Sequence, residues 1–295
     1  MPSLGTVAFA VGTGRCGTTF LSRALGLEPR IAASHERLRL AATFHMYCMW
    51  HGIDVDPEGF LIDREAAVAD DLGTHDVSFE ASALLSHSIA VLHERFNARF
   101  VWLVRNPAAT VASFAVRGWF ERPIPWGNSN LPPSYREGEE PRHFLGRNLP
   151  RGEGWARFRA LPPIGRLGWF WQARNQAICD QLAGLPPSHR LVQRLEDLDY
   201  PAYQRIVAFL GLDATLDPAS FEALAAERIN SGPNPPSPLD SWSTDDVTSY
   251  EAEVAPLANA IGYTFRVDAL RAGTHPCHEP LPPFETIRAR LHPSG

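Results

Sequence analysis

The first 120 residues alternate continuous apolar runs of strand length with segments of helical periodicity. The apolar runs predict strands at 6–12, 30–34, 76–80 and 98–105. The periodic segments predict helices at 17–26, 37–51, 82–95 and 107–117. Asn106 and Pro107 suit the N-cap and the first position of the last of these helices. Near-continuous apolar strands joined by helices favour a mostly parallel sheet with helices on both faces, a three-layer α/β sandwich.

Residues 121–167 break this alternation, because they are rich in proline, glycine, arginine and aromatic residues and follow neither period. A loop of this length inside a compact domain is usually a lid or a substrate loop, and a disordered insert is the alternative. We expect a lid, because aromatic side chains are costly to leave in water. The aromatic residues in question are Trp126, Tyr135, Phe144 and Trp155.

Regular structure is expected to resume after this long irregular insert. The pattern predicts a helix at 167–185, a strand at 190–194, a helix closing on Gly211, and helical pieces at 213–262 around a Pro-rich turn at 232–238. We therefore expect one domain over 1–267, with the insert at 121–167 inside it. A Pro-rich C-terminal arm would follow over 268–295.

All 27 basic residues of the 295-residue chain are arginine. The lack of lysine excludes Schiff-base chemistry and a phosphate-binding lysine. Any anion site must therefore use arginine, whose planar fork of donors fits phosphate or sulfate oxygens. The net charge of −6 argues against a nucleic-acid partner.

The sequence also bears on location and on metals. No apolar run approaches the length that crosses a bilayer, and the N-terminus carries no basic leader. The four cysteines show no paired spacing, so we expect a reduced, cytoplasmic protein. His275, Cys277 and His278 in "HPCHE" are a minor metal candidate in a Pro-rich tail, and we expect no metal there.

The stretch "VAFAVGTGRCGTTFLSRAL" (7–25) carries the candidate chemistry, because a strand runs into closely spaced glycines and then into a helix. From Gly12 the spacing is G-x-x-x-x-G followed by two threonines, the outline of a phosphate-binding P-loop. Backbone N–H groups and the helix dipole favour an anion at such a turn. We expect it to be held by the amides of Gly14, Gly17, Thr18 and Thr19 and by the threonine hydroxyls.

Two positions of this loop differ from those of a nucleotide hydrolase. Thr18 stands where the lysine belongs, and the nearest cation is Arg15. The later strand ends at Arg105, where a magnesium-dependent enzyme would want an aspartate. Cations at both places suit a donor rich in phosphate charge that is handled without a metal.

These residues resemble motifs of the sulfotransferases. "GTGRCGTTFL" looks like their 5′-phosphosulfate loop, which implies that the donor is bound by Gly12, Thr13, Gly14, Arg15, Cys16, Gly17, Thr18 and Thr19. "LVRNPAATVASF" resembles their 3′-phosphate motif, with Arg105 at a strand end and Ser113 eight residues on. The likeness extends to "VQRLEDL" (192–198) and loosely to "INSG…LDSW" (229–242).

The resemblance implies a P-loop-like fold, no metal, and 3′-phosphoadenosine 5′-phosphosulfate as donor, with adenosine 3′,5′-bisphosphate as product. The arginine form of the loop looks closer to the bacterial and tyrosylprotein enzymes than to the cytosolic ones. Arg15 would bind the bridging and sulfonate oxygens during an in-line transfer to an acceptor hydroxyl.

A base must remove the acceptor proton, and "RIAASHERLRL" supplies His35 and Glu36 at the end of the second strand. That strand end lies beside the loop in a parallel sheet. Similar enzymes carry a glutamate there, so the resemblance favours Glu36. His35 is the second candidate, with orienting Glu36 or capping the helix as its structural alternative.

Three positions depart from the family pattern. Relatives place Lys-Ser/Thr after the third strand, where this chain has Glu80, Ala81 and Ser82. Ser82 would keep the sulfonate contact, and Glu80 has the alternative role of a salt-bridge partner. Leu195 replaces the tyrosine before "ED", and Arg228 or an arginine of the insert would replace a C-terminal basic cluster.

The acceptor stays open among a glycan, a lipid and a secondary metabolite. Ser82, Glu36 and Trp119 are the candidate acceptor contacts. Trp242, like Trp119, suits either core or pocket, whereas helical spacing favours core for most of the residues Trp169, Phe170 and Trp171. The rival functions are a non-catalytic module that binds adenosine 3′,5′-bisphosphate or a sulfated ligand, and a P-loop kinase or NTPase.

Overall fold

The computed structural model describes residues 5–116, 120, 149–150, 152, 154–227 and 238–293. The chain divides into two compact units. The first combines Met1–Val104 with Asp180–Ser231, and the second combines Arg105–Cys179 with Gly232–Gly295. The chain therefore passes from one unit to the other three times, after Val104, after Cys179 and after Ser231.

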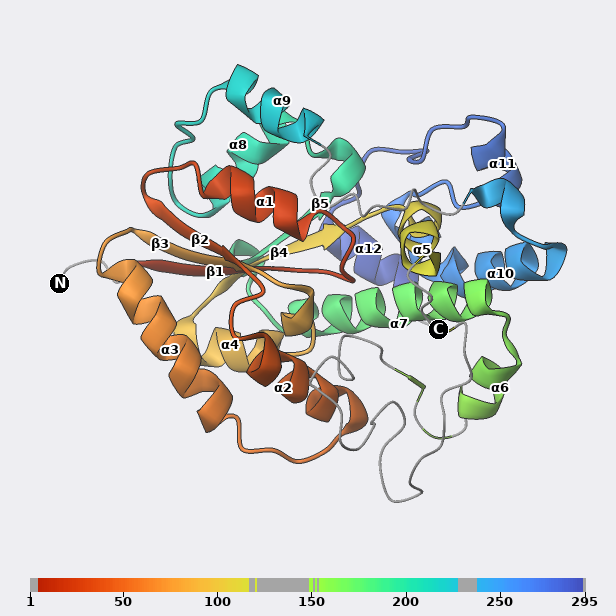
Figure 1. Cartoon of the computed structure of the whole chain (residues 1–295), viewed down its shortest axis with the longest axis horizontal. Helices are drawn as coiled ribbons and strands as arrows, with labels where there is room; N and C mark the ends of the chain where they lie inside the picture. The colour runs from red at the N-terminus through yellow and green to blue at the C-terminus, as the bar shows by residue number, and fades with distance from the viewer. Residues whose placement is uncertain are drawn as a thin grey trace. The chain divides into compact units, whose positions relative to one another are not determined.

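Within the described residues, the first unit contains a five-stranded sheet in the order β2-β3-β1-β4-β5 (Figure 1). The strands are β1 (Thr6–Val11), β2 (Ile31–His35), β3 (Val77–Ala81), β4 (Arg99–Val104) and β5 (Arg190–Arg194). Every neighbouring pair is parallel, which confirms the predicted sheet. β1 is central, and the register sets His35 of β2 level with Ala81 of β3.

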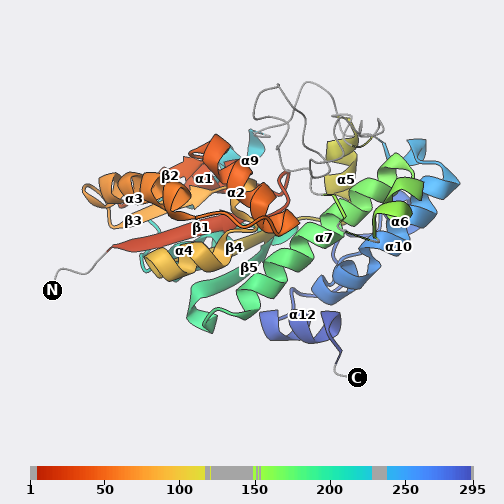
Figure 2. The same ribbon diagram turned by 90° about the horizontal axis from the view of Figure 1, so that it is seen from below.

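Helices cover both faces of this sheet (Figures 1 and 2). One face carries α1 (Thr18–Leu25), α8 (Tyr200–Phe209) and α9 (Pro218–Ala226); the other carries α3 (Glu58–Leu72) and α4 (Ile89–Phe96), with α2 (Arg39–His51) beside α3. Alternate β1 residues serve the two cores. Ala8 and Ala10 belong to the core with α1, whereas the ring of Phe9 lies 5.7 Å from that of Phe100. The three-layer α/β fold is thus confirmed.

The structure contains a helix that the sequence pattern did not predict. The buried residues of α3 recur at helical spacing and are Phe60, Leu61, Arg64 and Val68. An arginine in the middle of the apolar stripe hides the helical period, since arginine is rarely buried.

The helix predicted at 82–95 is wrong in its first half. A short 3₁₀ turn, η1 (Ala83–Leu85), precedes α4, which begins only at Ile89. The hydroxyl of Ser82 accepts a hydrogen bond from the Leu84 amide, and that of Ser86 donates to the Ala83 carbonyl. Serine side chains that bond the local backbone compete with a continuous helix.

The described part of the second unit is helical. Its elements are α5 (Pro107–Ala115), α6 (Gly154–Ala160), α7 (Pro163–Ala183, whose last turn enters the first unit), η5 (Leu239–Ser241), α10 (Thr244–Ile261), α11 (Val267–Arg271) and α12 (Phe284–Leu291). As predicted, Asn106 caps α5, accepting from the Ala108 amide at 3.0 Å, and Pro107 follows. The Asn106 amide also donates to the Thr264 carbonyl at 2.8 Å, which ties the start of α5 to the segment after α10.

Two helices begin where the sequence predicts an irregular insert. α6 lies wholly within 121–167, and α7 begins four residues before the predicted helix. Phe158 of α6 is buried, with its ring edge-on to those of Phe120 and Trp169. Aromatic burial of this kind stabilises a helix that has no visible apolar period. Trp126, Tyr135 and Phe144 lie outside the described residues.

The predicted arm at 268–295 includes α12, which packs on α10. Ile287 is fully buried, and Arg290 donates to the Ala260 carbonyl at 3.3 Å. The domain boundaries drawn from the sequence stay a prediction. Among the described helices, none has the length and hydropathy of a membrane span.

Candidate active site

The loop between β1 and α1 has the tight backbone that its glycines predict. Gly14, Arg15 and Gly17 all have positive φ angles, of 81°, 58° and 97°. Only glycine adopts such angles freely, so Arg15 holds a conformation that costs an ordinary residue about 1 kcal/mol. A Cβ on Gly17 would lie 2.5 Å from Leu195 Cδ1. Leu195, which comes directly after β5, therefore packs against the loop.

Contacts with β4 and with Ser86 also hold the start of the loop in place. A Cβ on Gly12 would lie 2.5 Å from the Leu103 carbonyl oxygen on β4. The Gly12 carbonyl accepts a hydrogen bond from Ser86 Oγ at 2.7 Å. Cys16 is fully buried and its side chain belongs to the hydrophobic core beside α1. Sequence reasoning missed Ser86, because nothing in a lone serine marks a contact made 74 residues along the chain.

The threonines of the loop differ in exposure and partners. Thr13 is buried, and its hydroxyl donates to the Gly14 carbonyl at 2.9 Å. Thr18 is buried and Thr19 half-buried at the first turn of α1. The Oγ1 atoms of both lie 3.2 Å from one atom, Nε2 of His35 at the end of β2. The structure thus brings one of the two predicted bases against the predicted anion loop.

Glu36 occupies a strained turn directly after β2. Its φ angle is 50°, and that of Leu38 is 54°. The Glu36 amide donates to the Ala81 carbonyl at 3.1 Å, which extends the pairing of β2 with β3 by one residue. Its carboxylate, about one-quarter exposed, pairs with Arg39 at 3.4 Å. Left-handed backbone at non-glycine residues costs free energy and is concentrated at functional sites.

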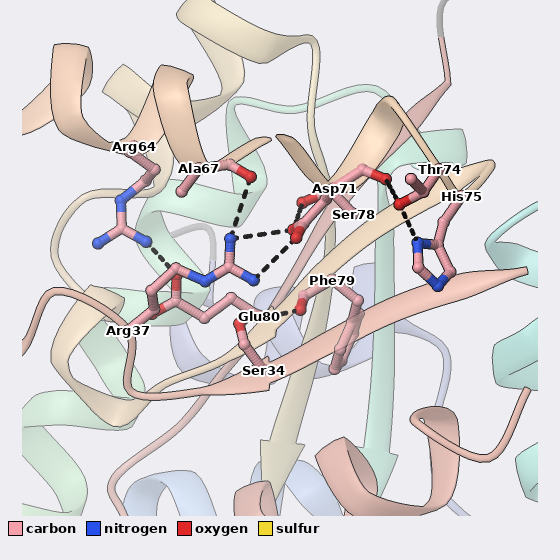
Figure 3. Close-up of polar contacts among 10 residues, drawn as sticks. All are labelled: Ser34, Arg37, Arg64, Ala67, Asp71, Thr74, His75, Ser78, Phe79 and Glu80. Carbon is pink, nitrogen blue, oxygen red and sulfur yellow. Dashed lines mark hydrogen bonds and ion pairs between the residues drawn. The ribbon is translucent and has the colours of Figure 1, made fainter. Parts of the chain in front are cut away.

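Arg37, between Glu36 and Leu38, attaches the turn to α3 (Figure 3). Its guanidinium donates to the Ala67 carbonyl at 3.2 Å, and one of its nitrogens lies 3.0 Å from Asp71 Oδ2. The same Asp71 oxygen accepts from Ser78 Oγ at 2.6 Å. The sequence offered no signal for this clamp, because its partners come from three separate elements.

Glu80 forms a buried ion pair with Arg64, the arginine in the apolar stripe of α3 (Figure 3). This contact is the salt-bridge alternative that the sequence left open. Burial raises the pKa of Glu80, against the opposing charges of Arg64 and Arg37. Burial also lowers the pKa of Arg64, with Glu80 acting in the opposite direction.

Ser82 is fully buried and its hydroxyl caps η1 by accepting from the Leu84 amide at 3.2 Å. Its backbone amide donates to the Ala10 carbonyl at 2.8 Å, which fixes the end of β3 to that of β1. This placement gives Ser82 a structural role. Its predicted contact with a sulfonate stays a prediction.

The residues predicted for the 3′-phosphate belong to the second unit. Arg105 is the first residue after β4, and its carbonyl accepts from Trp171 Nε1 at 3.1 Å. Ser113 is buried on α5. Phe170 and Trp171 are fully buried, as helical spacing predicted, and Trp169 is half-buried. Trp242 is buried with its ring 5.0 Å from that of Tyr250, whereas Trp119 and Arg228 lie outside the described residues.

Comparison with known proteins adds little. No family model matches the chain, and no curated protein matches it. Among solved structures, the sulfotransferase domain from the Synechococcus PCC 7002 olefin synthase aligns with a TM-score of 0.44 and 16% identity over 85% of this chain and 96% of that domain. The sulfotransferase domain from the curacin biosynthetic pathway aligns with a TM-score of 0.41 and 14% identity over 85% and 97%. At these TM-scores and identities the likeness is too weak to assign a family or a function to this chain.

Proposed function

We propose that the protein is a sulfotransferase that moves the sulfuryl group of 3′-phosphoadenosine 5′-phosphosulfate to an acceptor hydroxyl. The observation that carries the proposal is the contact of His35 Nε2 with Oγ1 of Thr18 and Thr19. It joins the strand end that bears the candidate bases to the loop that bears the candidate anion site. Acid–base chemistry beside a bound anion is what group transfer requires.

The loop fits the 5′ end of this donor better than it fits a nucleoside triphosphate. A single phosphate needs backbone amides and hydroxyls, which the start of α1 supplies through Thr18 and Thr19. No lysine is present anywhere in the chain to reach a second and a third phosphate. The donor supplies the sulfuryl group and a good leaving group.

Arg15 and Glu36 carry the chemistry in this proposal. The Arg15 guanidinium stays charged at all relevant pH values and stabilises negative charge as it grows on the 5′-phosphate oxygen. An S–O bond to the acceptor forms while the S–O bond to that phosphate oxygen breaks. The acceptor proton passes to the Glu36 carboxylate, and Arg39 holds that carboxylate in place from one turn along the chain.

Arg105 and Ser113 are proposed for the 3′-phosphate on the basis of their motif. This assignment makes a separate prediction: R105M should weaken adenosine 3′,5′-bisphosphate at least about 10-fold, because a charge-assisted contact is lost. Its affinity for adenosine 5′-monophosphate, which lacks the 3′-phosphate, should be unchanged. Equal weakening of both nucleotides would remove the assignment. A cytoplasmic location belongs to the proposal, because the four cysteines show no paired spacing in the sequence.

The test is transfer of labelled sulfate from the donor to a panel of glycan, lipid and small-metabolite alcohols. E36Q should lower kcat by about 10²–10⁴-fold and leave the affinity for adenosine 3′,5′-bisphosphate unchanged. E65Q, at an exposed glutamate of α3, is the matched control and should behave as wild type. Binding of the bisphosphate without transfer, and with no effect of E36Q, would instead favour the non-catalytic module.

A further inference from the structure

His35 stands in an unusual relation to the loop, because one ring nitrogen serves two hydroxyls. Nε2 lies 3.2 Å from Oγ1 of Thr18 and 3.2 Å from Oγ1 of Thr19. The ring reaches them from β2, which is separated from β1 by β3. The contact is therefore a feature of the tertiary fold and not of the loop itself.

Each threonine hydroxyl has one hydrogen to donate, and Nε2 of His35 has one or none. A neutral ring without hydrogen on Nε2 accepts from one threonine, so that hydroxyl hydrogen is used by His35 and cannot be donated to an anion. An anion in the loop needs hydroxyl hydrogens pointed at it. When the threonines donate to the anion, their oxygens present lone pairs to Nε2, and the nitrogen must then carry a hydrogen.

The charges around His35 decide which form carries that hydrogen. Burial and Arg39 lower the pKa of His35 below its ordinary 6.5, and Glu36 opposes them. The ring is therefore neutral at pH 7 in the free protein. A bound anion adds negative charge on the loop side, next to the hydroxyls that Nε2 contacts. That charge favours the imidazolium over a neutral ring that merely changes tautomer.

We propose that His35 is a positioning residue that takes up a proton when an anion enters the loop, and that its Nε2–H then turns both threonine hydroxyls toward that anion. The inference deepens the proposed function and rests on it for the anion site at the loop and for the identity of the donor. It assigns His35 a role through Thr18 and Thr19, distinct from that of the base. It also makes anion affinity depend on pH, with affinity rising as pH falls from the bound-state pKa toward the free-state pKa.

Sulfate is the probe, because it holds no proton that titrates near pH 7. The ¹H–¹⁵N spectrum of protein labelled in its histidine rings reports tautomer and charge, and H35Q identifies the signals of His35. At constant ionic strength, saturating sulfate in place of chloride should raise the midpoint of His35 by about one pH unit or more. An unchanged midpoint, or a change of tautomer without proton uptake, would overturn the inference.

His75 provides a control within the same spectrum. Its Nδ1 lies 2.9 Å from Thr74 Oγ1, a similar contact just before the other end of β3 (Figure 3). At a fixed pH, sulfate should leave the ring ¹⁵N signals of His75 unchanged. H35A should weaken sulfate about 10-fold, whereas H35Q keeps an N–H donor and should bind sulfate with no dependence on pH between 6 and 8.

Adenosine 3′,5′-bisphosphate separates this inference from the proposed function. If the bisphosphate binds and the His35 midpoint stays where it was, the inference fails while the sulfotransferase proposal stands. If sulfate moves the midpoint but the bisphosphate does not bind, the inference stands and the donor assignment fails.

Discussion

Arg37 and Asp71 are joined by two contacts, at 3.0 Å and 3.2 Å, and they attach the turn after β2 to α3. The turn holds Glu36 and Leu38 in left-handed conformations on either side of Arg37. Each such residue costs about 1 kcal/mol, so other contacts must hold the turn in place. The clamp supplies them and thereby fixes the position of the proposed base.

R37M should therefore damage both stability and activity. We expect the free energy of unfolding to fall by about 1–3 kcal/mol, because Asp71 loses a charged partner in a mostly buried setting. We also expect kcat to fall more than KM changes, since Glu36 is displaced. R30M removes the mainly exposed partner of Asp76 and should shift stability by no more than about 0.5 kcal/mol. Identical behaviour of the two variants in urea denaturation and turnover would contradict the role of the clamp.

Arg15 offers a test in which stability and activity change in opposite directions. R15G relieves the positive φ angle, so the protein should stay as stable as wild type or gain up to about 1 kcal/mol. Transfer should nevertheless fall at least about 10²-fold, because the cation at the loop is gone. R23M on α1, whose arginine forms an exposed pair with Glu227, should keep full activity. Retained activity in R15G would remove Arg15 from the mechanism.

Glu28 should make the protein more sensitive to acid. Burial raises the pKa of this carboxylate, but its bonds from Thr215, Tyr203 and Leu216 together lower it below the ordinary 4.5. Its stabilisation is thus present above pH 4.5 and lost as pH falls through the folded-state pKa. E28Q should cost about 1–3 kcal/mol at pH 7 and flatten the decline in stability toward acid. Denaturation midpoints measured from pH 3 to 7 check this, and parallel curves for the two proteins would contradict it.

Breaking the buried ion pair between Arg64 and Glu80 should make stability fall as pH rises. This is the opposite direction from the contribution of Glu28. R64M leaves the Glu80 carboxylate buried without its partner, at a cost of about 3–5 kcal/mol. Burial already raises the pKa of Glu80, and loss of Arg64 raises it further. Stability of R64M should therefore be highest below pH 4.5 and fall as pH rises through the folded-state pKa.

A second variant isolates the pair. R64M/E80L removes both charges and should be more stable than R64M alone at pH 8. Equal stability of the single and double variants would show that Glu80 is not left unpaired. The comparison needs only urea denaturation at two pH values.

Much of the fold could be predicted from local pattern, because β1, β4 and the capped start of α5 each carry their own signal. α3 could not, since its stripe contains Arg64, whose partner Glu80 lies on a strand. The break before α4 depends on serine hydroxyls that bond backbone, a choice that periodicity does not show. α6 depends on rings that meet only in the folded chain.

Part of the candidate site could likewise be predicted from the sequence, and part of it could not. The glycine spacing of the loop predicted a tight backbone turn, and the positive φ angles at Gly14 and Gly17 agree with that prediction. The sequence predicted that the end of β2 lies beside the loop, but not that Nε2 of His35 contacts the hydroxyls of Thr18 and Thr19, because no motif marks the direction of the His35 side chain. Arg37 and Asp71 are 34 residues apart, and no motif marks either of them.

A calorimetric titration tests the central claim most directly. Wild-type protein is titrated with adenosine 3′,5′-bisphosphate and, separately, with ATP and Mg²⁺, and R15M is titrated alongside. We predict that the bisphosphate binds without added metal, that it binds more tightly than ATP with Mg²⁺, and that R15M weakens it. Tighter binding of ATP with Mg²⁺ would contradict the assignment of this loop to a phosphosulfate donor.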